Sequence, residues 1–320
     1  MTENIRIASY FGDIGTCGRN DGSPLYITHR LRSIFGPENI AHLFPKGDLS
    51  KFGKFDYHLL VDWGEDALGY EDFELPHPSI YITSDTHLGF DYRLSRAKRC
   101  DWVFCNQRQA REDFVKAGIP GDRCFWLPHA FDPGAYSPGF FNLSTDSWNT
   151  NAAMAKRYDV CFVGHLNDLN RVTHLDRLFK AFPNFYWGVK KFHEAAEVFN
   201  QSRIVFNVSS RKELNMRHFE ALGCKSLLLS DLIPQDQNVF EEGKHFVGYS
   251  NMDEMIEKAK YYLAHEDEAN KIAEAGYLEA ISKHTYLHRI LAVLDTVGVP
   301  YDRNKAMSLL PDVQREPLVA

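Results

Sequence analysis

The sequence predicts an α/β fold with two doubly wound domains that face a cleft, and three observations support this prediction. Short apolar runs alternate with amphipathic stretches almost from end to end, as strands and helices alternate in βαβ units. The alternation fails once, around residues 131–156, and then restarts. The chain has 320 residues, a length that suits two domains.

The first half of the chain carries strands and helices in turn. Amphipathic helices are expected at residues 23–35 and 107–118, and the second ends at Gly118, the residue type that most often follows a helix. Residues 131–156 are rich in Pro, Gly, Ser and Asn without a sustained period, so they predict an interdomain linker. Candidate strands lie at residues 5–11, 57–63, 79–85, 101–107 and 123–129.

The second half repeats the pattern and sets the domain limits. We expect an N-terminal α/β domain at 1–133, a linker at 134–157, a C-terminal α/β domain at 158–284, and a tail at 285–320 that packs back on the N-terminal domain. Candidate strands lie at residues 158–164, 185–189, 203–209, 225–231 and 244–250. Candidate helices lie at residues 172–182, 193–202, 252–276 and 284–298.

Composition excludes several classes of protein. The net charge of -7 argues against a general affinity for nucleic acid or anionic membranes. The six cysteines form no CxxC pair, which favours a reduced, cytoplasmic chain without a zinc cluster or a disulfide framework. No apolar run approaches the roughly 20 residues that span a bilayer, and the N-terminus lacks the pattern of a signal peptide. We therefore expect no membrane span and no metal site.

A glycine-rich loop follows the first expected strand. Gly12, Gly15, Gly18 and Gly22 allow tight turns and a close approach of the backbone to a ligand. Their spacing differs from GxGxxG, so a dinucleotide site is poorly supported. The loop either lines a substrate site, with Asp13 as an acidic member, or is a flexible surface loop.

Acidic and histidine side chains end two other strands. Asp85 and His87 lie at a carboxyl edge, where they could serve an acceptor hydroxyl by hydrogen bonding or general-base catalysis. As a metal pair they would need further ligands, and the sequence offers none. The alternative is that Asp85 caps the N-terminus of a helix and that His87 is hydrogen-bonded within the protein and has no role in catalysis. His129 and Asp132 either face the cleft in the same way or only shape the turn into the linker.

Three charged residues of the second half allow two interpretations each. Arg171 follows a strand and Gly164, so it could bind a diphosphate with its fork of donors or form an exposed salt bridge. Arg217 and Glu220 are neighbours on one expected helix. They form either a surface ion pair worth under about 1 kcal/mol, or a carboxylate for ribose hydroxyls with an arginine near the phosphates.

A family resemblance favours the second interpretation. The second half contains YDVCFVGHLNDLNR, then SRIVFNVSSRKELNMRHFEALGCKSLLLSD, then NVFEEGKHFVGYSNMDEMIEKAKYYL. The pattern N-x-S, N-x-R-x-F-E-A, G-C and F-x-x-G-K-H resembles the CgeB-type glycosyltransferases, which are family-4-like enzymes that use nucleotide sugars. The resemblance covers residues 157–290 well and the first half more loosely, through SDTH, DWVFCNQ and LPHAFDP.

The resemblance implies a GT-B fold of two Rossmann-like domains, with the donor in the C-terminal one. Glu220 matches the second glutamate of the family's Glu-x7-Glu motif, which holds the donor ribose. Gly164 matches the glycine of the first loop of that domain, and Arg171 matches the basic residue that meets the diphosphate. Asn215 and Arg217 belong to the CgeB-type version of the motif and are expected near the donor.

The N-terminal domain would then carry the acceptor side. His87 lies where related enzymes often carry an acceptor-side histidine, and the loop with Gly12, Gly15 and Gly18 would line the acceptor. The expected reaction moves a sugar from a UDP- or GDP-linked donor to an acceptor hydroxyl. The nucleotide sugar is a co-substrate, and no tightly bound cofactor is expected. The acceptor is a glycan, a protein, a small molecule or a modified nucleobase.

One departure from the family pattern bears on the chemistry. Lys212 stands eight positions before Glu220, where the motif has its first glutamate, and Glu213 is displaced by one residue. The usual contact to the sugar hydroxyls and retention of the anomeric configuration are therefore open. An inverting reaction would need a base such as Asp13 or Asp85. A sugar-nucleotide epimerase and a catalytically silent nucleotide-sugar-binding protein remain as alternatives.

Overall fold

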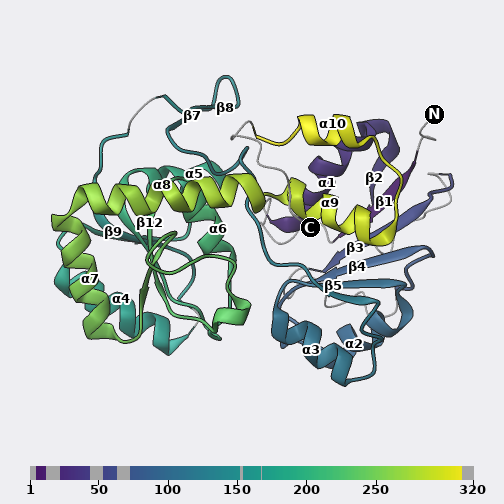
Figure 1. Cartoon of the computed structure of the whole chain (residues 1–320), viewed down its shortest axis with the longest axis horizontal. Coiled ribbons are helices and arrows are strands. Elements are labelled where there is room, and N and C mark those ends of the chain that lie inside the picture. The colour runs from purple at the N-terminus through teal and green to yellow at the C-terminus, as the bar shows by residue number, and fades with distance from the viewer. Residues whose placement is uncertain are drawn as a thin grey trace. The chain divides into compact units, whose positions relative to one another are not determined.

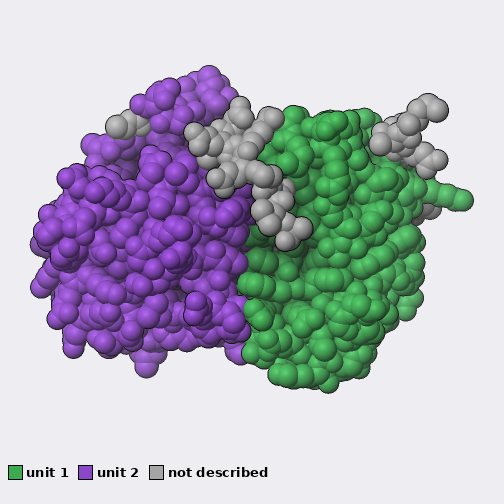
Figure 2. All heavy atoms as spheres, viewed as in Figure 1, with its two compact units in different colours: residues 1–128, 286–311 green, residues 129–285, 312–320 purple. Residues whose placement is uncertain are grey.

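The computed structural model describes residues 5–11, 22–43, 53–62, 73–151, 154–166 and 168–311. These residues form two compact units (Figure 2). Unit 1 contains the described residues up to Pro128 together with Tyr286–Pro311, and unit 2 contains His129–Thr285. The expected site residues Gly12, Asp13, Gly15 and Gly18 lie outside the described residues.

Unit 1 is built on a parallel sheet with the strand order β2-β1-β3-β4-β5-β6. Helices α1 and α9 pack together on one face, and α2 and α3 cover the other (Figure 1). The strands are β1 (Ile7–Tyr10), β2 (Ile40–Leu43), β3 (Tyr57–Asp62), β4 (Ser79–Thr83), β5 (Trp102–Cys105) and β6 (Cys124–Trp126). The helices are α1 (Ser23–Phe35), η1 (Pro37–Asn39), α2 (Phe90–Arg99), α3 (Arg108–Lys116), α9 (Tyr286–Val297) and α10 (Arg303–Ser308).

Unit 2 repeats this plan with the parallel order β10-β9-β11-β12-β13. Helices α4 and α7 pack on one face of the sheet, and α5 and α6 pack on the other (Figure 1). The strands are β7 (Phe140–Asn142), β8 (Ser147–Asn149), β9 (Tyr158–Val163), β10 (Phe185–Gly188), β11 (Ser202–Asn207), β12 (Leu227–Asp231) and β13 (Val247–Tyr249). The helices are α4 (Leu169–Ala181), α5 (Phe192–Asn200), α6 (Met216–Gly223), η4 (Gln235–Gln237), α7 (Met252–Ala264) and α8 (Glu266–Lys283).

The predicted fold class is confirmed, with differences in detail. The stretch 134–157, expected as a linker, lies in unit 2 and contains the antiparallel hairpin β7–β8. The expected helix at residues 252–276 is two helices, because the chain leaves the helical conformation at His265, where φ is -120° and ψ is 66°. None of the helices among the described residues is long and apolar enough to cross a bilayer.

Strand β2 and helix α2 of unit 1 were not predicted from the sequence, for a physical reason in each case. Strand β2 has only four residues and lies at the edge of the sheet, so its apolar run is too short to stand out. Helix α2 lacks an apolar stripe, because its buried positions are Arg93, Arg96 and Ala97. A helix whose buried face is made of arginine gives no hydrophobic period.

The buried arginines of α2 are paired with one carboxylate. Arg93 donates to both oxygens of Asp62, from Nε to Oδ2 at 3.1 Å and from Nη2 to Oδ1 at 3.0 Å, and both side chains are fully buried. Tyr81 donates its hydroxyl hydrogen to the same carboxylate, and Arg96 Nη1 lies 3.9 Å from it. Asp62 ends β3, so this ion pair fixes α2 at the carboxyl edge of the unit 1 sheet.

We expect Asp62→Ala to destabilise the protein by about 3–5 kcal/mol, because it leaves two buried guanidinium groups without their carboxylate. The loss is measured as the free energy of unfolding in urea. Asp176→Ala is the matched control, since it removes an exposed carboxylate that pairs with Lys180 one turn away and should cost under about 0.5 kcal/mol. Similar losses in the two variants would contradict the role given to the buried pair.

Candidate functional site

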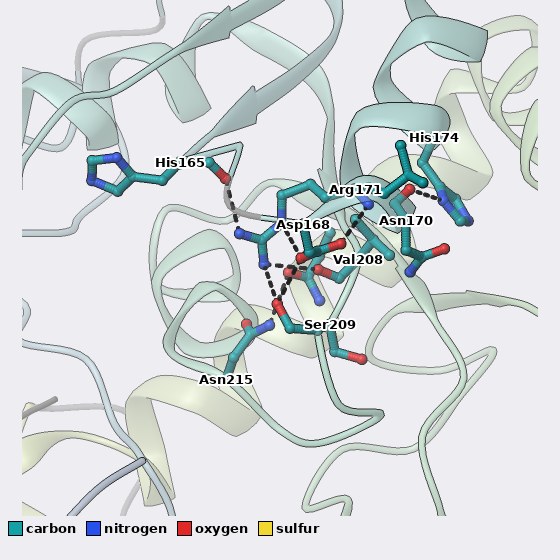
Figure 3. Close-up of polar contacts among 12 residues, drawn as sticks. His165, Asp168, Asn170, Arg171, His174, Val208, Ser209 and Asn215 are labelled. Atoms are coloured by element: carbon teal, nitrogen blue, oxygen red, sulfur yellow. Dashed lines mark hydrogen bonds and ion pairs between the residues drawn. The ribbon is translucent and has the colours of Figure 1, made fainter. Parts of the chain in front are cut away.

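The polar side chains of unit 2 gather at the carboxyl edge of its sheet. Strands β9 and β11 are neighbours and run parallel, so the loops that follow them lie side by side. The first loop starts at Gly164 and leads into α4, and the second runs from Val208 to Asn215 and leads into α6. Ligands of open α/β sheets bind at this edge, and Figure 3 shows the polar contacts there.

Arg171 links the two loops through hydrogen bonds. Its Nη1 donates to the carbonyl of His165 at 2.9 Å, and its Nη2 donates to the carbonyl of Val208 at 3.4 Å and to Ser210 Oγ at 3.1 Å (Figure 3). Asp168 caps α4 by accepting from the Arg171 backbone N–H at 2.7 Å, and it also accepts from Ser210 Oγ at 3.0 Å. Burial lowers the pKa of Arg171. The residue therefore shapes the edge before any ligand arrives.

Arg217 is fixed at the same edge by uncharged groups. Its Nε and Nη2 donate to the carbonyl of Val163 at 2.9 and 2.6 Å, and its Nη1 donates to Asn207 Oδ1 at 2.7 Å. The guanidinium carbon lies 4.3 Å from the centre of the Phe162 ring. A Cβ at Gly164 would come within 2.4 Å of Arg217 Nη2, so only glycine leaves room for this arrangement.

The two arginines bring positive charge together, and Asp168 offsets part of it, because its Oδ2 lies 4.0 Å from Arg171 Nε. The guanidinium carbon of Arg171 lies 5.5 Å from the centre of the same Phe162 ring. Burial and then the charge of Arg171 lower the pKa of Arg217 to about 10. Among the described residues, no carboxylate lies within ion-pair distance of Arg217. Glu220, one turn along α6, is half-buried and contributes only a longer-range attraction to it. Such a site favours an anionic ligand.

Asn207, which accepts from Arg217, belongs to a network of buried hydrogen bonds. Asn207 Oδ1 also accepts from Asn215 Nδ2 at 3.1 Å, and Asn207 Nδ2 donates to Ser230 Oγ at 2.9 Å. Ser230 Oγ lies 3.1 Å from His218 Nε2, and His218 Nδ1 accepts from the Asn215 backbone N–H at 3.4 Å. Burial lowers the pKa of His218 to about 4, so the ring is neutral at pH 7.

Asp231 is a structural residue of the site that the sequence analysis missed. Its buried carboxylate accepts from the Ser209 N–H at 2.8 Å, from Ser209 Oγ at 2.7 Å and from Lys212 Nζ at 3.1 Å. Lys212 has a φ of 55°, which is uncommon for a residue other than glycine. The sequence did contain a signal for this role, because Asp231 is the last residue of the apolar run LLLSD. A charged side chain at the end of a buried strand needs hydrogen-bond or ion-pair partners.

Unit 1 places two expected site residues in one turn after β4. Asp85 has a φ of 48°, and its neighbour His87 is exposed. Burial raises the pKa of Asp85, against the charges of His87 and Arg93, which favour its ionised form. Arg93 donates from Nη1 to the carbonyl of Asp85 at 3.0 Å and also to the carbonyl of Leu88. The buried ion pair of α2 therefore holds the backbone of this turn.

Asp132 has a local structural role in unit 2. Its Oδ1 accepts from the Gly134 N–H at 2.8 Å, and its carbonyl accepts from the N–H groups of Ala135 and Tyr136, both at 2.9 Å. These contacts are those of a turn whose first residue is aspartate. The structure supports the second of the two interpretations, in which Asp132 shapes the chain after β6.

Residues 162–295 match the protein-family model described as "Glycosyl transferase-like". The match covers less than half of the chain, but it runs from β9 into α9 and includes Arg171, Arg217 and Asp231 at the carboxyl edge of unit 2. No curated protein sequence matches the chain.

Solved structures resemble almost the whole chain. HepE from Anabaena, in complex with UDP and glucose, has a TM-score of 0.66 at 11% identity, with 92% of this chain and 100% of that chain covered. UDP-GlcNAc 2-epimerase from Neisseria meningitidis, bound to UDP-GlcNAc, has a TM-score of 0.53 at 10% identity, with 92% and 100% covered. Sucrose-phosphate synthase from Thermosynechococcus elongatus has a TM-score of 0.54 at 8% identity, with 76% and 73% covered. These identities show the fold alone, and the fold is the predicted GT-B.

The low pKa of His218 predicts an acid-sensitive site. Below about pH 6.5 the unfolded chain binds a proton at this residue, while the folded protein does so only near pH 4, so stability falls as the pH falls through this window. We expect wild type to lose about 2 kcal/mol more than His218→Gln between pH 7.5 and pH 5. Urea unfolding at the two pH values measures the difference.

His265→Gln is the matched control for this titration, because His265 is exposed. This variant should lose as much stability on acidification as wild type does. If His218→Gln also behaved like wild type, His218 would titrate alike in the folded and unfolded chain, and the prediction would be wrong.

Proposed function

We propose that the protein is a glycosyltransferase that moves a sugar from a nucleotide-sugar donor, UDP- or GDP-linked, to an acceptor hydroxyl. The observation that carries the proposal is the arginine pair at the carboxyl edge of unit 2. The guanidinium groups of Arg171 and Arg217 both lie over the ring of Phe162. All three residues are in the region that matches the glycosyl transferase-like family. A diphosphate is an anion that suits two such guanidinium groups. The similar structure of HepE, which is in complex with UDP and glucose, supports a nucleotide sugar as the ligand class.

The donor roles follow from this placement. Arg217 and Arg171 would face the diphosphate, and Gly164 keeps the backbone clear beside Arg217. Glu220 lies one turn beyond Arg217 on α6, where its carboxylate would accept two ribose hydroxyls. Asn215 caps α6 by accepting from the Arg217 N–H at 3.1 Å, so it would orient the helix that carries both residues. The assignment to the CgeB type is part of this proposal.

Unit 1 would supply the acceptor side through Asp85 and His87, which share one turn. The raised pKa of Asp85 suits a proton acceptor near neutral pH better than an ordinary aspartate. His87 is exposed and would hydrogen-bond the acceptor. The glycine loop with Gly12, Gly15, Gly18 and Asp13 lies outside the described residues, and its acceptor role stays a prediction.

Lys212 leads us to propose inversion of the anomeric configuration. Its ammonium is directed to Asp231, at the position where the family motif has its first glutamate. Asp85 would then be the base that the inverting reaction needs. A cytoplasmic location also belongs to the proposal, supported by five cysteines of the described chain that are buried and free: Cys100, Cys105, Cys124, Cys161 and Cys224.

A sugar-nucleotide epimerase is the second candidate, because an epimerase bound to UDP-GlcNAc shares the fold. UDP- and GDP-linked hexoses are screened first by thermal shift, where a ligand at 100 times its Kd adds about 2.7 kcal/mol of stability. The products of the best ligand then separate the candidates. We expect free nucleotide with the sugar moved to an acceptor or to water. A changed sugar on an intact nucleotide would identify the epimerase, and binding without turnover would identify a silent binding protein.

Glu220→Gln tests the donor site at one residue. The substitution keeps the shape but removes charge-assisted hydrogen bonds worth roughly 1.5–3 kcal/mol, so donor affinity should fall about 10- to 150-fold. Calorimetric titration of the best nucleotide measures the change. Glu257→Gln, an exposed glutamate on α7, is the control and should bind as wild type does. Unchanged affinity in a folded Glu220→Gln variant would remove Glu220 from the site.

A further inference from the structure

Gln107 contacts Asp85 with both ends of its side-chain amide. Its Oε1 accepts from the Asp85 backbone N–H at 3.1 Å, and its Nε2 donates to Asp85 Oδ1 at 3.3 Å. The same Nε2 lies 3.4 Å from Ser84 Oγ. Strands β4 and β5 are paired so that Thr83 lies opposite Cys105. Asp85 and Gln107, each two residues further, therefore meet beyond the carboxyl edge of the sheet.

These contacts fix an aspartate in an unusual conformation. The φ of Asp85, 48°, is uncommon for a residue with a Cβ, and it persists only where the surroundings determine it. Gln107 holds the N–H and Oδ1, and Arg93 holds the carbonyl from the other side. In the part of the chain that the structure describes, no donor lies within hydrogen-bond distance of Asp85 Oδ2.

We propose that Gln107 is the positioning residue for the Asp85 carboxylate and directs its free oxygen, Oδ2, to the acceptor hydroxyl; this rests on the transferase function proposed above. In that step the acceptor O–H gives its proton to Asp85 Oδ2. The acceptor oxygen forms the bond to the anomeric carbon. The bond from that carbon to the phosphate oxygen breaks, and the nucleoside diphosphate leaves with the electron pair.

Gln107 also sets the pH at which Asp85 can act. The charged groups of unit 1 that act on Asp85 are Asp62 on β3, His87 in the same turn and Arg93 on α2. Burial raises the pKa of Asp85, and the hydrogen bond from Gln107 opposes the rise. Loss of this bond should raise the pKa further. A base must be deprotonated, so the acidic limb of the rate profile should then move to higher pH.

Gln107→Glu tests the proposal with a side chain of the same size. A carboxylate at this position still accepts from the Asp85 N–H, but it donates nothing to Oδ1 and adds a negative charge. We expect the titration midpoint of Asp85 to rise by about one pH unit or more. It is followed by NMR of ¹³C-labelled aspartate, with Asp85→Asn to assign the signal. UDP release from UDP-glucose at pH 6 should fall about tenfold, with unchanged affinity for UDP.

Two further variants make the test specific. Gln109→Glu adds the same charge to an exposed position of α3 and should leave both the midpoint and the rate at the wild-type values. Gln107→Leu removes the donor without adding a charge and should shift the midpoint in the same direction, which keeps the test valid if Gln107→Glu does not fold.

The two readouts separate the two proposals. An unchanged Asp85 midpoint in a folded Gln107 variant would overturn the positioning role, and so would a shifted midpoint with an unshifted rate profile. Absence of nucleoside diphosphate release from every UDP- and GDP-linked sugar in wild type would overturn the transferase function. The NMR midpoint would still report on the contact between Gln107 and Asp85 in that case.

Discussion

The placement of the Arg217 guanidinium is the constraint on which the carboxyl edge of unit 2 depends. It ties α6 to the end of β9 through the Val163 carbonyl and to the end of β11 through Asn207. The position of the Arg217 guanidinium requires glycine at position 164. The guanidinium lies over the ring of Phe162, and the guanidinium of Arg171 lies over the same ring. Because its acceptors are neutral, its charge is stabilised without being cancelled. The edge is therefore held in one shape while the charge of Arg217 is retained.

The other polar residues of the site hold the loops around Arg217 in place. Arg171 joins the loops after β9 and β11, and the buried carboxylate of Asp231 holds the second loop through Ser209 and Lys212. His218 remains neutral inside the same network, because burial opposes its protonation. A charged His218 beside Arg217 would raise the cost of the arrangement. The hydrogen-bonded buried groups thus stabilise one geometry of the loops.

The sequence predicted the strands well because buried parallel strands are continuous apolar runs, as YDVCFVG and KSLLLSD are. It failed for α2, whose buried face is arginine, and for the four-residue edge strand β2. Among the candidate site residues, Arg171 and Arg217 were predicted from position and resemblance, and both lie at the carboxyl edge of unit 2. Asn207, which binds Arg217, and Gln107, which binds Asp85, were not predicted, since they act through contacts between different elements of the sheet edge. Local pattern carries no information about such contacts.

The two units use the same physical device with opposite electrostatic results. In each, a buried arginine donates to backbone carbonyls at the end of the sheet, and a side-chain amide fixes a neighbouring group: Arg93 with Gln107 in unit 1, Arg217 with Asn207 in unit 2. Arg93 is neutralised by the fully buried Asp62, whereas Arg217 meets no carboxylate among the described residues. The same cation therefore has a structural role in unit 1 and retains an attraction for anions in unit 2. This difference is the physical reason why we propose unit 2, and not unit 1, as the unit that binds the diphosphate.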